Sequence, residues 1–170
     1  ELVEQPPSSI IFLTSANSDI STISSTIQER EICLSETIRA LPIAALEHPA
    51  QIDHYISTTA EEANLILVRI HGGRGHWSYG LEKLSNWLNR KTNRKLVVIS
   101  GTKDHVLELH SIGNVDIEIT NYLSSLFIQG GVENMSSVLS ICNNLVRNKR
   151  IDISKYPIKI LEDPLKWRWE

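Results

Sequence analysis

The sequence predicts an α/β protein with a doubly wound, mostly parallel sheet of about four to five strands flanked by helices, flavodoxin-like or Rossmann-like. Short aliphatic runs recur along the chain, and the clearest is Asn64–Ile70 (NLILVRI). A near-continuous aliphatic run indicates a strand that is buried on both faces. Stretches with apolar residues at helical spacing separate these runs, and alternation of this kind is typical of a parallel sheet.

Length and composition agree with a folded protein. The chain has 170 residues, of which 41% are hydrophobic and 22% charged, with a net charge of −3. These values exclude a disordered chain, and the slightly acidic balance argues against nucleic-acid binding. No apolar run approaches the roughly 18 residues that a membrane span needs. We expect a lead-in over residues 1–8, the α/β domain over 9–150, and a tail over 151–170 that connects to another domain.

The first half of the chain is predicted as two strand–helix units. A buried strand spans residues 9–16, and Ser18 or Asp19 is expected to cap a helix that runs to Arg30. That helix should place Ile20, Ile23 and Ile27 on one face. A second strand is predicted over 38–45 and a helix over 51–63.

The second half continues the alternation and then becomes helical. We predict a strand over 64–70, a loop over 71–78, a helix over 79–88, a strand over 96–100, a short helix ending near 110, helices over 119–129 and 132–146, and a weak strand over 158–161. The pair Gly130-Gly131 is expected to end the first of the two late helices, because glycine tolerates the left-handed conformation.

Candidate ligand-binding residues lie in the loops that follow the strands. Ligands of doubly wound sheets bind beyond the carboxyl ends of the strands, which here means the loops 14–19, 71–77 and 101–105. Arg69, near the end of a buried strand, needs either an acidic side chain or a ligand carboxylate as its partner. The Gly72-Gly73 amides precede a helix and could bind an anion.

Trp77 and Tyr79 add aromatic surface beside these amides. The alternative is a tight turn between strand and helix, with the aromatic residues in the core and Arg69 in an internal salt bridge.

Several other chemistries are excluded or left without support. The run Gly-Gly-Arg-Gly lacks both the GxGxxG and the P-loop spacing, and there is no GxSxG motif. His71 and His76 are not at a standard chelating spacing, so no metal site is predicted. Cys33 and Cys142 are far apart and interpreted as buried residues of a protein in a reducing, cytoplasmic compartment. No catalytic residue is assigned.

Two features point to contacts with other chains or domains. Glu133-Asn134 follows the glycine pair and is either a simple helix cap or a polar contact to a partner domain. Trp167 and Trp169 alternate with basic residues near the end of the chain and are interpreted as part of an interdomain surface. Because the chain begins with Glu1 and not with Met, we expect that its start has been trimmed or that it is a piece of a longer protein.

A longer motif carries a family resemblance. Residues 69–74 (RIHGGR), followed by Trp77, Tyr79-Gly80 and Glu82, resemble the amino-terminal region of the large subunit of aerobic cobaltochelatase, the CobN type. That family also includes the porphyrin-binding subunit of magnesium chelatase. Weaker matches in the same order, over residues 9–146, are Leu13–Ile20, His48-Pro49 with Asp53 and Tyr55, Thr59-Ala60 with Ala63, and Gly130-Gly131 with Glu133-Asn134.

The resemblance implies a function. In that family the large subunit holds a tetrapyrrole, a corrin or porphyrin, while AAA+ subunits hydrolyse ATP to insert a divalent metal, cobalt or magnesium. This domain would then contribute to tetrapyrrole binding or to assembly with the rest of the large subunit, and alone it would be inactive. The ligand-binding set implied here is Asn17, Asp19, Arg69, His71, Gly72, Gly73, Arg74, His76, Trp77 and Tyr79.

Three positions depart from the family pattern. Asn17 stands where an aspartate is typical, His71 where a leucine is usual and His76 where an aromatic residue is expected. Two other functions stay open from the residues: a non-catalytic interaction module, and a flavodoxin-like protein that binds a phosphorylated cofactor.

Overall fold

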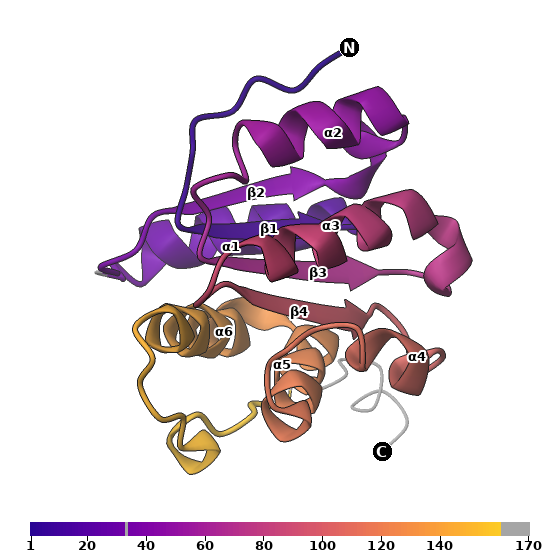
Figure 1. The fold of residues 1–170 in the computed structure, drawn as a ribbon. Helices are drawn as coiled ribbons and strands as arrows, with labels where there is room; N and C mark the ends of the chain where they lie inside the picture. Colours follow the sequence, from indigo (N-terminus) through magenta and orange to yellow (C-terminus); the bar gives the residue numbers. More distant parts are fainter. Residues whose placement is uncertain (33, 161–170) are drawn as a thin grey trace.

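A parallel four-stranded sheet in the order β2-β1-β3-β4 forms the centre of the computed structural model, which describes residues 1–32 and 34–160 (Figure 1). The strands are β1 (Ile10–Thr14), β2 (Ile38–Pro42), β3 (Leu65–Ile70) and β4 (Lys95–Ser100). The helices are α1 (Asn17–Glu29), α2 (Pro49–Ser57), α3 (Ser78–Arg90), α4 (Val106–His110), α5 (Ile117–Gln129) and α6 (Gly131–Val146). This architecture confirms the predicted α/β fold class.

Helices cover both faces of the sheet, as the aliphatic strands require. Every residue of β1 and β3 is buried. Alternate side chains of these strands pack with α2 and α3 on one face, while the remaining ones pack with α1, α5 and α6 on the other (Figure 1). The chain reverses its direction across the sheet between β1 and β3, which is the switch point where sheets of this kind bind ligands.

The start of α1 differs from the prediction. Neither Ser18 nor Asp19 is the N-cap, because the helix begins at Asn17 behind Ala16, which has no side chain able to cap it. Asp19 is instead buried in the first helical turn. Of the three predicted apolar positions only Ile23 is buried, and Ile27 is 38% exposed. The polar Asp19 thus takes a place on the inner face of the helix that the sequence pattern assigned to isoleucine.

Two other elements are shorter than predicted, and one predicted strand is not formed. The second strand ends at Pro42, and Ile43–Leu46 form a 3-10 turn in place of further strand. Helix α2 begins at Pro49, which suits the first helical turn, and ends at Ser57 instead of residue 63. Residues 158–160 form no strand, so that part of the predicted strand over 158–161 is wrong.

The two glycines at the junction of α5 and α6 end α5 as predicted. Gly130 and Gly131 both have positive φ, +74° and +84°, and the N–H of Gly130 donates to the carbonyl of Leu126 at the end of α5. The chain therefore turns sharply and starts α6 at once. Among the described residues, no helix has the length and apolar character that crossing a membrane requires.

Residues 1–8, expected as a lead-in, lie along α2 and the edge strand β2. The Gln51 side chain donates to the carbonyl of Glu1, and the Tyr55 hydroxyl donates to Gln5 at 2.6 Å. Gln5 in turn donates its side-chain amide to the carbonyl of Ala40 in β2. These contacts hold the segment against the domain.

Candidate functional site

A shallow hollow of about 380 Å³ lies at the carboxyl edge of the sheet. Three segments that follow β1, β2 and β3 surround it, and its lining residues are Ser15, Ile43, Ala44, Glu47, His76 and Trp77. The hollow therefore sits where the strand order predicts a ligand site. Two of the three predicted loops, 14–19 and 71–77, contribute to it, and the third, 101–105, does not line it.

Arg69 has the acidic partner that one of the two interpretations required. Its Nη1 lies 2.8 Å and 3.0 Å from the two carboxylate oxygens of Asp19. Each side chain is only 10% exposed. The Thr14 hydroxyl donates to the same carboxylate at 2.6 Å, and the guanidinium lies over the ring of Phe127 at 5.3 Å. This buried pair joins the end of β3 to the first turn of α1, so it sets the shape of the switch point from inside.

The Arg69 guanidinium also reaches the third loop. Its Nη2 lies 3.4 Å from the carbonyl oxygen of Gly101. Within the described part of the chain, Nε of Arg69 is buried without a hydrogen-bond partner. Arg69 thus links β3 to the start of α1 and to the loop after β4, and its charge is directed at Asp19 and not into the hollow.

One backbone amide of the 71–77 loop already binds a carboxylate of the protein itself. The backbone N–H of Arg74 donates to Oε1 of Glu108, from α4, at 3.1 Å. Glu108 also lies 3.4 Å from Nδ1 of His105. Gly72 has a φ of +93°, and a Cβ at this position would lie 2.4 Å from the ring of His76. A Cβ at Gly73 would lie 3.1 Å from the His105 ring, so an imidazole packs closely on each of the two glycines.

The side chains on the outer part of this loop remain open. Arg74 and His76 are exposed, and so is His71, whose backbone N–H donates to the Ser15 hydroxyl at 3.1 Å. Asn17, at the start of α1, is exposed as well. These four side chains are the polar groups of the predicted set that face solvent at the carboxyl edge. No group of three or more potential metal ligands occurs among the described residues.

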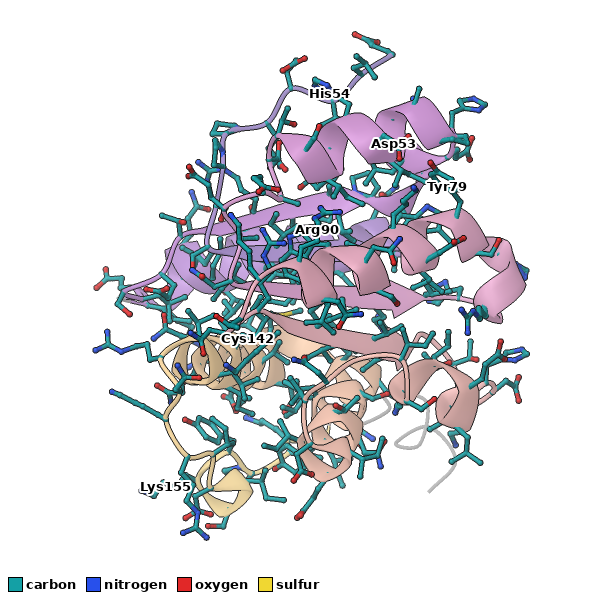
Figure 2. All side chains as sticks on the ribbon, viewed as in Figure 1. Asp53, His54, Tyr79, Arg90, Cys142 and Lys155 are labelled. Atoms are coloured by element: carbon teal, nitrogen blue, oxygen red, sulfur yellow. The ribbon has the colours of Figure 1, made fainter. Side chains whose placement is uncertain are left out.

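Trp77 and Tyr79 have different environments. Trp77 is 7% exposed, and its indole N–H donates to the carbonyl of Leu46 at 2.9 Å, so its ring belongs mainly to the core and forms part of the floor of the hollow. The Tyr79 hydroxyl donates to both carboxylate oxygens of Asp53, at 2.8 Å and 3.0 Å, and links α3 to α2 (Figure 2). This hydrogen bond raises the pKa of Tyr79 above its ordinary value. Tyr79 does not line the hollow.

Glu133 and Asn134 both contact Lys159, in the segment that follows α6. Asn134 is buried and donates to the carbonyl oxygens of Gly130 and Lys159, and its Oδ1 accepts the N–H of Lys159 at 2.8 Å. Glu133 pairs with Arg30 at 3.2 Å and with Lys159 at 3.1 Å. The backbone N–H groups at the start of α6 receive no side-chain cap hydrogen bond, so the Gly130 contact is not a helix cap, and a contact to a partner domain stays a prediction. Trp167 and Trp169 lie outside the described residues.

Sequence reasoning missed four residues that line the hollow or fill its neighbourhood. Ile43 and Ala44 lie in the turn after β2 but were predicted as strand, Glu47 follows this turn, and Glu108 was not among the predicted ligand-binding residues. The signal that could have found the first three is Pro42, because a proline that ends a strand brings the next residues to the carboxyl edge. Nothing local in the sequence marks Glu108 as the partner of the Arg74 amide.

Comparisons with known proteins point to one enzyme. No family model matches the sequence. The chain is 31% identical over 143 residues to the aerobic cobaltochelatase subunit CobN of Sinorhizobium sp., and 29% identical over 133 residues to that of Pseudomonas aeruginosa. The matches cover 84% and 76% of this chain but only 11% and 10% of those relatives. The chain thus spans about a tenth of their length.

A solved structure agrees at the level of the fold. The catalytic subunit of cobaltochelatase from Mycobacterium tuberculosis superposes with a TM-score of 0.67 at 18% identity, over 94% of this chain and 12% of that one. The sequence matches and the shared fold each cover more than three quarters of this chain. This protein is therefore homologous to a part of the CobN-type subunit of aerobic cobaltochelatase.

Proposed function

We propose that this chain is the amino-terminal domain of a CobN-type cobaltochelatase large subunit and supplies one wall of its tetrapyrrole site. The observation that carries the proposal is the hollow at the carboxyl edge of the sheet, bordered by the 71–77 loop. That loop belongs to the motif on which the family resemblance rests. The relationship to the CobN subunits over most of the chain supports the same assignment.

The side chains that would contact the tetrapyrrole ring are those that are exposed to solvent near the hollow. Arg74 would bind a peripheral carboxylate of the tetrapyrrole through charge-assisted hydrogen bonds, and His76 would contact the ring from the mouth of the hollow. Asp19 and Arg69 would keep the loops in place without touching the ligand, because their charges are already paired inside.

The size of the hollow limits what this domain does. Its volume of about 380 Å³ lies at the lower end of the range of roughly 300–1,000 Å³ for small-molecule pockets. Since a tetrapyrrole is larger than a typical small ligand, other parts of the large subunit would hold most of the ring. The divalent metal, the ATP and the AAA+ subunits would act on the assembled enzyme, and this domain alone would not insert metal.

The test compares two arginine variants of the full-length large subunit. Arg74→Ala removes an exposed guanidinium of the 71–77 loop, which borders the hollow, whereas Arg90→Ala removes one at the end of α3, near the opposite edge of the sheet (Figure 2). Loss of a hydrogen bond to a charged group should weaken tetrapyrrole affinity about tenfold or more for Arg74→Ala, measured by absorbance titration. Arg90→Ala should bind as the wild type does. Equal affinities for both variants would contradict the role of Arg74.

A second candidate, binding of a phosphorylated cofactor, has one observation in its favour. Helix α1 begins at the switch point between β1 and β3, and its N-cap Ala16 provides no side-chain acceptor for the first amides. A phosphate group is stabilised by such a helix start. Flavin or nucleotide released on heating the purified protein would support this candidate, and inorganic phosphate should then compete with it.

A further inference from the structure

The middle of the 71–77 loop is held by a side chain from another part of the fold. Hydrogen bonds of the His71 N–H and of the Trp77 indole fix the two ends of this loop. Between them, the backbone N–H of Arg74 donates to Oε1 of Glu108 at 3.1 Å. Among the described residues, no further hydrogen bond joins the part of the loop between its two ends to a different segment. The contact with Glu108 therefore restrains the tip of the loop.

Glu108 belongs to α4, and the position of this helix is fixed independently of the loop. The buried His110 accepts the N–H of Ser100, the last residue of β4, on Nε2 at 3.1 Å. Its Nδ1 lies 2.7 Å from Oδ1 of Asn121 in α5, which places the imidazole proton on Nδ1. Leu109 is fully buried as well. Two neighbouring elements thus anchor α4, and Glu108 reaches the loop from a firm support.

The contacts around Glu108 bring two loops together. Oε2 of Glu108 lies 3.4 Å from Nδ1 of His105 and 3.6 Å from the place that a Cβ of Gly73 would take. His105 has a φ of +61°, a left-handed conformation that is uncommon for a residue with a side chain. Such a conformation persists only where the surrounding contacts hold it. The loop after β4 is therefore fitted to the 71–77 loop, with Glu108 between them.

We propose that Glu108 is a positioning residue that holds the 71–77 loop in the shape in which Arg74 binds a ligand carboxylate. The inference rests on the proposed function, which assigns this contact to Arg74. The amide and the guanidinium belong to the same residue, so fixing the amide restricts where the exposed side chain can reach.

Glu108 also determines which group of Arg74 meets the ligand. Its carboxylate already takes the backbone N–H of Arg74, so a carboxylate of the tetrapyrrole is left to the exposed guanidinium. Glu108 does not line the hollow, and it acts on the ligand through Arg74.

The experiment compares three variants in the 170-residue chain and in the full-length large subunit. Glu108→Ala removes the acceptor of the Arg74 N–H, whereas Glu108→Gln keeps an uncharged oxygen that can accept it. Leu107→Ala is the matched control, because Leu107 precedes Glu108 in α4 and is 88% exposed. Alanine and glutamine both favour helices, so α4 should persist in every variant.

Nitrogen-15 relaxation of the 170-residue chain measures the mobility of the loop without a ligand. In Glu108→Ala the order parameters of residues 72–76 should fall from about 0.85, typical of a rigid backbone, towards 0.6. The wild type, Glu108→Gln and Leu107→Ala should keep the higher values. Unchanged order parameters in Glu108→Ala would overturn the inference, whatever the loop binds.

Absorbance titration of the full-length large subunit with coproporphyrin, a porphyrin that carries carboxylates, measures the consequence for binding. Glu108→Ala should weaken affinity about fivefold or more, because a mobile loop spends only part of its time in the competent shape. Adding Glu108→Ala to Arg74→Ala should weaken binding no further, since the two residues act as a unit. Glu108→Gln should bind as the wild type does.

The outcomes separate this inference from the proposed function. If Arg74→Ala weakens binding and Glu108→Ala does not, the positioning role of Glu108 is overturned while the role of Arg74 stands. An equal loss in Glu108→Gln and Glu108→Ala would show an effect of charge and would also overturn the positioning role. If Arg74→Ala binds normally, the proposed function is refuted, and the order parameters still decide whether Glu108 holds the loop.

Discussion

The buried pair of Asp19 and Arg69 leads to a prediction about stability that does not depend on function. Asp19→Ala leaves the guanidinium of Arg69 without its partner at a position where the side chain is only 10% exposed. Removing one partner of a buried ion pair costs about 3–5 kcal/mol, because the remaining charge stays desolvated. The loss should be near the upper value, since the same carboxylate also accepts the Thr14 hydroxyl. Urea unfolding followed by circular dichroism measures this cost.

A double-mutant cycle separates the pair from simple loss of packing. Adding Arg69→Met to Asp19→Ala removes the unpaired charge and should restore most of the lost free energy of unfolding. The matched control is Lys91→Ala, which breaks the exposed ion pair with Glu61 and should cost less than about 1 kcal/mol. If Asp19→Ala costs no more than the control, the pair is not desolvated and our account of the switch point is wrong.

Three further predictions use other parts of the domain. Gly80→Ala should destabilise the fold by about 1–3 kcal/mol, because a Cβ there would lie 2.2 Å from the indole of Trp77, and Trp77→Leu in the same chain should recover part of this loss in urea unfolding. Burial raises the pKa of the Cys142 thiol to about 12. In a variant without the other cysteine, a thiol reagent at pH 8 should therefore react with Cys142 only as fast as the protein unfolds. Rapid labelling in native buffer would refute this. Hydrogen bonds to two cationic side chains lower the pKa of Glu133 below its ordinary 4.5, so its contribution is present above pH 4.5 and is lost as the pH falls through the lowered value. Glu133→Gln should lack this acid-dependent part of the stability profile, and identical profiles for the two proteins would contradict it.

The sequence predicted most of the sheet and less of the helices. Residues 64–70 and 96–100 are identified as strands because most of their side chains are aliphatic, as a strand that is buried on both faces requires. The inner face of helix α1 was harder to predict, because Asp19 and Thr26 are buried in this helix and Ile27 is not. A polar residue on the inner face of a helix is stable only with a partner from elsewhere, which the local pattern does not contain.

The same limit applies to the candidate site. Arg69 was correctly identified as a buried charge that needs a partner, but the choice between a ligand and an acidic side chain depended on Asp19, which lies 50 positions earlier. The hollow likewise depends on Pro42, which ends β2 early and brings Ile43 and Ala44 to the carboxyl edge. The ligand-binding roles of Arg74, His71 and His76 stay predictions.

The amino-acid sequence by itself determined the fold class, the position of the loops at the carboxyl ends of the strands, and the kinship with cobaltochelatase subunits. These properties follow from patterns of neighbouring residues. Only the tertiary structure decided which charged side chains are paired in the interior and which remain exposed near the hollow. Arg69 is paired with Asp19, and the backbone N–H of Arg74 donates to Glu108, while the Arg74 side chain remains exposed. Pairing of this kind depends on distances between residues far apart in the chain, and such distances exist only once the sheet has assembled.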